Sequence, residues 1–317
     1  MSEAAAHIPG GAQAPLAVSA LPASEVRDWI TLLKPRVLTL VVYTGVAGLL
    51  VAPGSLHPVL ALTAILCITV AAGAAGAINM WYDRDIDAVM RRTQRRPIPA
   101  GRISADGALA YGVLLGAASV ALMGLATNWL AAAILAGSIL FYVVIYTMWL
   151  KRRTPQNIVI GGAAGAFPPL IGWVAVTGSV DALPLVLFAI VFFWTPPHFW
   201  ALSLWAHQDY ARAGVPMLPV VAGARETRRQ VLIYTLLLVP LTLLPWAMGF
   251  SGWLYAGAAL LLGAGFLRHA LAVWRDAQDA EGVSLAEDLP AKRCFKYSIS
   301  YLFLLFGALV VDRLWLA

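Results

Sequence analysis

The chain is 317 residues long, and 61% of its residues are hydrophobic whereas only 12% are charged. In soluble domains roughly a quarter of the residues are charged, so this composition excludes an ordinary soluble protein and indicates a polytopic membrane protein. The formal net charge of +6 would suggest a nucleic-acid partner in a soluble chain. Here the placement of the charges fits membrane topology instead, and we expect no nucleic-acid partner.

The N-terminal segment is rich in Ala, Pro and Gly and lacks a basic stretch followed by an apolar core. We therefore expect residues 1–28 to be a disordered cytoplasmic tail rather than a cleavable signal. Residues 29–317 are expected to form one all-α domain of nine transmembrane helices around a cytoplasm-facing cavity. The apolar stretches of spanning or near-spanning length are 36–52, 58–80, 107–127, 129–150, 156–177, 182–205, 231–250, 252–272 and 296–316.

The connections between these stretches alternate between short, nearly uncharged turns and longer charged segments. With nine spans, every one of the 22 Lys and Arg residues except Arg313 falls on the side of the N-terminus. The positive-inside rule makes that side cytoplasmic, with the C-terminus on the opposite side. We expect a multi-pass protein of the bacterial cytoplasmic (inner) membrane, with the lipid bilayer as its surroundings and its site open to the cytoplasm.

A charge-dense segment follows the second span. On an α-helix, positions 79, 83 and 87 fall within an arc of roughly 80°, so Asn79, Asp83 and Asp87 would line one face. One amide and two carboxylates at this spacing suit Mg²⁺, which is usually completed by waters and substrate phosphates, better than Zn²⁺, which prefers His and Cys.

Guanidinium groups, which can bind phosphate oxygens two at a time, come directly after these three residues. They belong to Arg91, Arg92, Arg95 and Arg96. Together the two sets predict a metal–diphosphate site. The alternative is a juxtamembrane loop whose arginines set topology and whose aspartates neutralise them, and that reading does not need the regular spacing.

Two further segments are rich in polar side chains. A basic turn between the fourth and fifth spans runs from Tyr146 through Lys151, Arg152 and Arg153 to Asn157, and its cations could reach the same diphosphate. Interfacial aromatic anchors with a topology-setting basic cluster are the alternative there. In the sixth span, Trp-Thr-Pro-Pro-His198-Phe-Trp places an ionisable residue inside the membrane, which indicates a functional role. The alternative is that His198 only forms a hydrogen bond to a neighbouring helix.

These motifs resemble those of a known family. Asn-x-x-x-Asp-x-x-x-Asp followed by Arg-Arg-Thr-x-x-Arg-Pro is similar to the first motif of the UbiA-type intramembrane prenyltransferases, which binds the Mg²⁺-complexed diphosphate of an isoprenoid donor. Trp-Thr-Pro-Pro-His-Phe-Trp and Asp-Tyr-x-x-x-Gly-Val-Pro-Met-Leu-Pro resemble one branch, the protohaem IX farnesyltransferases, over about residues 30 to 315. The second acidic motif of the superfamily is depleted: His198 stands roughly where an Asp would be, and Asp209 is the carboxylate that remains.

The resemblance implies farnesyl diphosphate and protohaem IX as substrates, Mg²⁺ as cofactor and haem O as product. It implies that Asn79, Asp83 and Asp87 bind the metal, and that Arg92, Arg96, Lys151 and Arg152 bind diphosphate. Asp83, Asp87, Lys151 and His198 would be catalytic. The substrate or haem pocket would contain Tyr146, Asn157, His198, Trp200 and Asp209.

Several alternatives stay open at this point. A prenyltransferase of the same fold could act on a quinone or another aromatic precursor. A bundle with polar residues inside the membrane could be a transporter, although a transporter would place them in several spans near mid-membrane. A non-catalytic assembly subunit of a respiratory oxidase would have no use for a metal–diphosphate motif. A haem A synthase or a terminal oxidase is a candidate partner downstream.

Overall fold

The structure is a computed structural model that describes residues 24–280 and 282–316. Within these ranges the elements are helices joined by turns, which confirms the all-α prediction. In chain order they are α1 (Val26–Leu32), α2 (Pro35–Val51), α3 (Pro58–Tyr82), α4 (Arg84–Val89), α5 (Ala105–Ala126), α6 (Trp129–Leu140), the π-helix η1 (Phe141–Leu150), α7 (Asn157–Gly161), α8 (Ala163–Thr177), α9 (Ala182–Arg212), α10 (Leu218–Val221), α11 (Gly223–Leu241), α12 (Leu244–Ala247), α13 (Trp253–Trp274) and α14 (Leu289–Leu316).

Eight helical stretches in the described ranges are long and apolar enough to cross a membrane. Three of them combine two elements: α6 with η1, α7 with α8, and α11 with α12. A ninth candidate is the pair Val26–Leu32 and Val37–Val51, which is bent by 60°. The expected tail lies outside the described residues up to position 23, and residues 26–28 form the start of α1 instead.

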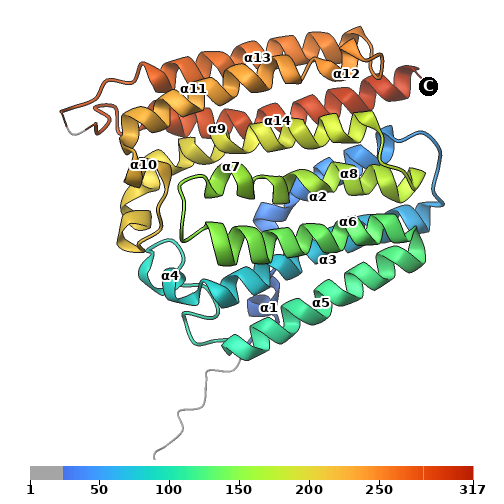
Figure 1. Cartoon of the computed structure of the whole chain (residues 1–317), viewed down its shortest axis with the longest axis horizontal. Coiled ribbons are helices and arrows are strands. Elements are labelled where there is room, and N and C mark those ends of the chain that lie inside the picture. The colour runs from blue at the N-terminus through green and yellow to red at the C-terminus, as the bar shows by residue number, and fades with distance from the viewer. Residues whose placement is uncertain (1–23, 281, 317) are drawn as a thin grey trace, which may run out of the picture.

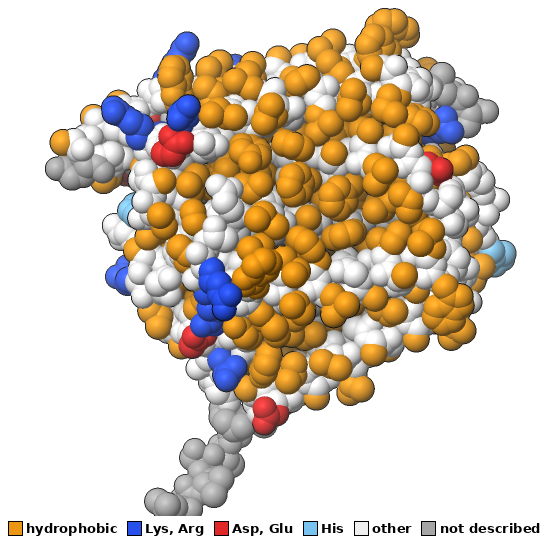
Figure 2. Space-filling view, in the orientation of Figure 1, with side chains coloured by type: hydrophobic (Ala, Val, Ile, Leu, Met, Phe, Trp, Pro, Cys, Tyr) orange, Lys and Arg blue, Asp and Glu red, His pale blue; other side chains and the backbone are white. Residues whose placement is uncertain are grey.

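The long helices lie side by side, and α4 and α10 lie together at one end of the bundle (Figure 1). The C-terminus lies at the opposite end (Figure 1). Helix α14 packs against α2, so the last long helix meets the first and closes the bundle. Hydrophobic side chains cover the middle of the face shown in Figure 2, whereas most of its Lys and Arg side chains gather toward the end that carries α4 and α10.

Helices α2 and α8 approach each other closely because their crossing is lined by glycine. A Cβ atom on Gly48 would lie 2.1 Å from the carbonyl oxygen of Pro169, and one on Gly172 would lie 2.2 Å from that of Gly45. Small residues allow such close backbone contact between membrane helices, where packing rather than the hydrophobic effect holds helices together. A larger side chain at Gly48 or Gly172 would therefore push α2 and α8 apart.

Candidate functional site

The predicted ladder of Asn79, Asp83 and Asp87 is divided between two helices. Helix α3 ends at Tyr82, Asp83 is the junction, and α4 begins at Arg84, so the expectation of one continuous helix was wrong. The backbone bonds from Asp83 N to Asn79 O (2.9 Å) and from Asp87 N to Asp83 O (2.8 Å) persist through the junction. The three residues are only 4%, 0% and 2% exposed, so their side chains point into the protein rather than toward lipid.

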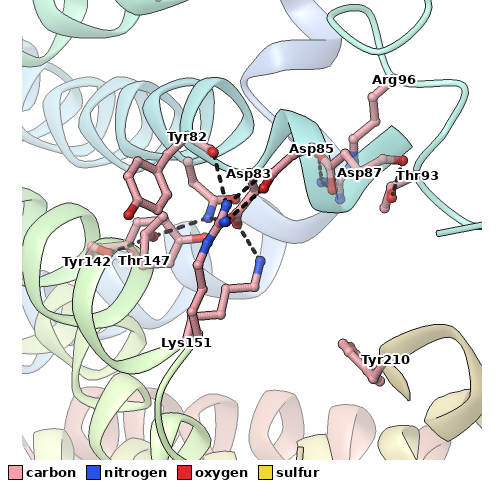
Figure 3. A network of polar contacts seen from close by, with 12 residues as sticks. Tyr82, Asp83, Asp85, Asp87, Thr93, Arg96, Tyr142, Thr147, Lys151 and Tyr210 are labelled. Carbon is pink, nitrogen blue, oxygen red and sulfur yellow. Dashed lines mark hydrogen bonds and ion pairs between the residues drawn. The ribbon is translucent and has the colours of Figure 1, made fainter. Parts of the chain in front are cut away.

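Asp83 is the centre of a polar network (Figure 3). Its Oδ2 accepts hydrogen bonds from Lys151 Nζ and from Asn79 Nδ2, the latter at 2.7 Å. Arg152 Nη2 lies 3.6 Å from Oδ1, and that oxygen is buried without a hydrogen-bond donor within the described residues. A buried carboxylate is stable only when charges and donors surround it, and here the basic turn and the first motif supply them in one polar network.

Arg152 also joins this network to Asp85, a residue that the sequence analysis did not select. Its two terminal nitrogens donate to the Asp85 carboxylate at 2.7 and 2.8 Å, and its guanidinium lies over the ring of Tyr82 at 4.9 Å. The hydrogen bond from Arg152 lowers the pKa of Asp85 to about 2. Because this pKa is depressed, the contribution of the pair is present above the ordinary carboxyl pKa and is lost as the pH falls through about 2.

Asp87 forms a further ion pair of the site. Arg96 Nη1 donates to both of its oxygens, at 2.9 and 2.7 Å. Arg92 extends in another direction and donates to the Tyr210 hydroxyl on α9 at 3.4 Å. Thus Arg96, Lys151 and Arg152 lie at the acidic residues, whereas Arg92 links the loop after α4 to the sixth span.

Besides Asp85, two further residues of the site were missed by sequence reasoning. Lys34 Nζ donates to Asn79 Oδ1 at 2.6 Å, and Asn79 Nδ2 is 3.1 Å from the Thr147 hydroxyl. Thr147 belongs to η1, where Lys151 N bonds Tyr146 O five residues back at 2.9 Å. The π geometry of η1 extends over ten residues, and π-helical segments, which are rare, occur frequently at functional sites. The sequence signal for Lys34 was its place beside a proline at the start of the first span, where it was counted only as a topology determinant.

We refer to these eight side chains as the acid–base cluster. They are Lys34, Asn79, Asp83, Asp85, Asp87, Arg96, Lys151 and Arg152. Its candidate metal ligands are hard carboxylate and amide oxygens, and Asp83 Oδ1 accepts no hydrogen bond from the described residues, so the cluster fits a hard divalent cation. Within the described residues no three His, Cys, Asp or Glu side chains meet closely enough to hold a metal on their own. A cation held there would need an amide oxygen and oxygens of a bound ligand to complete its coordination.

His198 lies in a separate contact set between α9 and α14. Its ring stacks between Trp194 and Phe295, with centroids at 4.3 and 4.6 Å. Its Nδ1 is 2.7 Å from the Ser298 hydroxyl, and the Ser298 carbonyl accepts from Trp194 Nε1 at 2.8 Å. Ser298 was not selected from the sequence. These contacts hold the side chain in one orientation. The alternative given in the sequence analysis, that His198 bonds a neighbouring helix, is also what the structure shows.

The remaining candidates occupy different surroundings. Tyr146 packs beside Tyr142 with ring centroids 5.3 Å apart. Asn157 and Trp200 are 0% and 1% exposed, and Asn157 Oδ1 and Trp200 Nε1 have no hydrogen-bond partner in the described parts of the chain. Asp209 is ion-paired with Arg212 on its own helix. None of these contacts by itself assigns a substrate.

Comparison with known proteins identifies the class to which this fold and site belong. The chain belongs to the UbiA prenyltransferase family, whose model matches residues 40–310. Its sequence is 70% identical over 287 residues to protoheme IX farnesyltransferase of Acidiphilium cryptum, a match covering 90% of each chain. It is 65% identical over 303 residues to protoheme IX farnesyltransferase of Granulibacter bethesdensis, covering 93% of this chain and 96% of that protein.

Solved structures share the fold at much lower sequence identity. A digeranylgeranylglyceryl phosphate synthase superposes with a TM-score of 0.73 at 17% identity, covering 91% of this chain and 98% of the other. A UbiA homologue from Archaeoglobus fulgidus bound to DMAPP and Mg²⁺ gives a TM-score of 0.62 at 18% identity, covering 88% of this chain and 99% of the other. These likenesses confirm the helical membrane fold.

Proposed function

We propose that this chain transfers the farnesyl group of farnesyl diphosphate to a vinyl group of protohaem IX, with addition of water, to give haem O and diphosphate. The observation that carries the proposal is the buried Asp83 carboxylate bonded by Lys151 and Asn79 at the charged end of the bundle. The high identity to two protoheme IX farnesyltransferases supports the choice of substrates.

Asn79, Asp83 and Asp87 would hold Mg²⁺ together with oxygens of the diphosphate. A bound divalent cation stabilises the negative charge that grows on the departing diphosphate oxygens. Arg96, Lys151 and Arg152 already lie at the carboxylates and would transfer part of their hydrogen bonding to the diphosphate, with Arg92 approaching from the loop after α4. Such placed positive charges are usually the largest contribution to lowering this kind of barrier.

The transfer itself breaks the bond between farnesyl C1 and the diphosphate oxygen and joins C1 to a vinyl carbon of the haem. The resulting haem-side cation takes up water, and one proton leaves. An allylic cation needs walls that exclude bulk water and aromatic faces that stabilise positive charge, each worth about 0.5–2 kcal/mol. Tyr142 and Tyr146 of η1 present such faces within the same helix that positions Lys151.

His198 is the proposed contact to the haem. Its Nδ1 is engaged by Ser298, and within the described residues no hydrogen bond is recorded for its Nε2. That nitrogen could bind the haem iron, orient the porphyrin or accept a proton from the attacking water. Asn157, Trp200 and Asp209 remain proposed members of the same pocket, and the unpartnered Trp200 Nε1 and Asn157 Oδ1 support a polar ligand nearby.

We further propose that the acid–base cluster faces the cytoplasm of a bacterial inner membrane, with the N-terminus on the same side. The positive-inside distribution of Lys and Arg supports this orientation. A haem A synthase or a terminal oxidase is the proposed kind of downstream partner, since haem O has to be passed to a protein that uses it.

The test is direct conversion by the purified protein. Incubation with haem b, farnesyl diphosphate and Mg²⁺ is expected to yield a porphyrin heavier by one farnesyl and one hydroxyl group, as measured by mass spectrometry. Removing Mg²⁺ with a chelator should stop the conversion. Farnesylation of an aromatic quinone precursor, with haem b left unchanged, would replace this proposal by the rival prenyltransferase.

A further inference from the structure

Lys34 occupies an unusual backbone position at the edge of the acid–base cluster. It lies between α1 and α2, where the chain bends by 60°, and its φ and ψ of 55° and 50° are left-handed. Residues other than Gly, Asn and Asp rarely adopt this conformation, and it persists only where the surroundings hold it. Here the side chain ends on Asn79 Oδ1 at 2.6 Å, 45 residues along the chain.

That contact engages the one atom of Asn79 that could bind a cation and places the Lys34 amino group 2.6 Å from it. An amide offers its carbonyl oxygen as the acceptor and its nitrogen only as a donor. The nitrogen of Asn79 is used by Asp83 and Thr147, while the oxygen is used by Lys34. The predicted metal ligand is therefore already bonded to an amino group of the protein itself.

The charge balance of the acid–base cluster also opposes binding of a bare cation. Three carboxylates (Asp83, Asp85 and Asp87) face four basic side chains (Lys34, Arg96, Lys151 and Arg152). Even without Lys34 the charges balance, so a bare divalent cation would add uncompensated positive charge to a buried site. A cation that arrives with a prenyl diphosphate brings more negative than positive charge and gives the displaced Lys and Arg groups new acceptors.

We infer that Lys34 keeps the site free of a bare divalent cation, so that the cation is taken up only together with the diphosphate. This inference rests on the proposed metal–diphosphate function. Lys34 acts through Asn79 and is a positioning residue for uptake: it releases the amide oxygen when the diphosphate offers its amino group a better partner. Binding of donor and cation is then a single event, and the empty protein does not accumulate metal.

Equilibrium dialysis with Mn²⁺ tests the inference without relying on turnover. Protein-bound Mn²⁺ is measured at the same free Mn²⁺ concentration with and without inorganic pyrophosphate. The wild-type protein is expected to bind Mn²⁺ at least about 10-fold more tightly when pyrophosphate is present. Lys34→Met should bind Mn²⁺ alone about 10-fold more tightly than the wild type, because Asn79 Oδ1 becomes available.

Lys296→Met is the matched control, because it removes the same charge from an exposed position on α14. It should behave as the wild type, which separates the local contact from the change in net charge. Equal Mn²⁺ binding by the wild type with and without pyrophosphate would overturn this inference alone, as would unchanged binding by Lys34→Met. Failure of the wild type to bind Mn²⁺ under either condition would overturn the proposed metal site as well. The wild-type comparison stands even if Lys34→Met does not fold.

Discussion

Asp83 and Asp85 stand two residues apart and share Arg152, yet they have opposite surroundings. Asp83 is fully buried, whereas the side chain of Asp85 is 62% exposed. We expect Asp83→Asn to lower turnover by about 100-fold or more, because it removes the buried charge that pairs with Lys151 and is the proposed ligand of the cation. Asp85→Asn should change turnover by less than about threefold, since an exposed ion pair contributes little. Product formation by the two purified variants measures the difference.

Thermal unfolding provides the control for this pair. Both variants should unfold cooperatively and elute as the wild type does, so that lost turnover reports the site and not the fold. Equal losses in the two variants would contradict the special role given to Asp83.

His198 and Ser298 allow the proposed haem contact to be tested separately from binding of the prenyl donor. His198→Ala is expected to lower haem O formation by about 100-fold, the usual effect of losing a positioned acid–base group, while binding of radiolabelled farnesyl diphosphate is retained. Ser298→Ala should give a smaller loss, because it removes only the 2.7 Å bond that orients the ring. Parallel loss of donor binding in His198→Ala would show that the residue supports the bundle instead.

At the scale of the element, η1 depends on a glycine in the following helix. A Cβ atom at Gly161 would lie 2.2 Å from Tyr146 Cδ2, whereas one at Gly165 would meet no atom within 4 Å. Gly161→Ala should therefore displace η1 and with it Lys151, with a cost of about 1–3 kcal/mol in stability and a marked loss of turnover. Gly165→Ala should be neutral or slightly stabilising. Thermal unfolding and product formation of the two variants test this prediction. Unchanged stability and turnover in Gly161→Ala would show that the Tyr146 side chain can move aside without displacing η1.

The elements also explain which parts of the site could be predicted. Local spacing identified the first motif and the basic turn, because both lie in short segments of dense charge. It could not reveal that α3 stops at Tyr82. The break at Asp83 is a change of backbone direction that leaves the i to i+4 hydrogen bonds in place, so no helix-breaking residue marks it in the sequence. Lys34 and Ser298 were missed because their partners lie 45 and 100 residues away, and one chain alone carries no record of such pairings.

At the scale of the whole molecule, the proposed orientation makes a labelling prediction. Ser55 and Ala280 are exposed in loops at opposite ends of the bundle, while the native Cys67 and Cys294 are 1% and 0% exposed. In intact cells a membrane-impermeant thiol reagent should label Ser55→Cys and should label Ala280→Cys only after lysis. The reverse pattern would place the acid–base cluster on the outer side.

The overall architecture was the most predictable feature, because apolar length and the asymmetry of Lys and Arg are properties of the chain as a whole. The first span was the exception. Its bend at Lys34 separates α1 from α2, and residues 26–28, the first turn of α1, were expected to belong to a tail. A short helix with two charged residues, Arg27 and Asp28, has no apolar signature, and Asp28 is held by Arg102 from a loop 74 residues further on.

The contact between α2 and α14 has a consequence for how the protein is made. A growing chain inserts its helices in order, so the flank of α2 stays uncovered until the final 28-residue helix leaves the ribosome. Ser298 belongs to that same helix, so His198 has no partner there until 100 further residues have been synthesised. A prematurely terminated chain can therefore contain every residue of the acid–base cluster and still lack the Ser298 partner of His198, so the site around His198 is completed only when translation is complete.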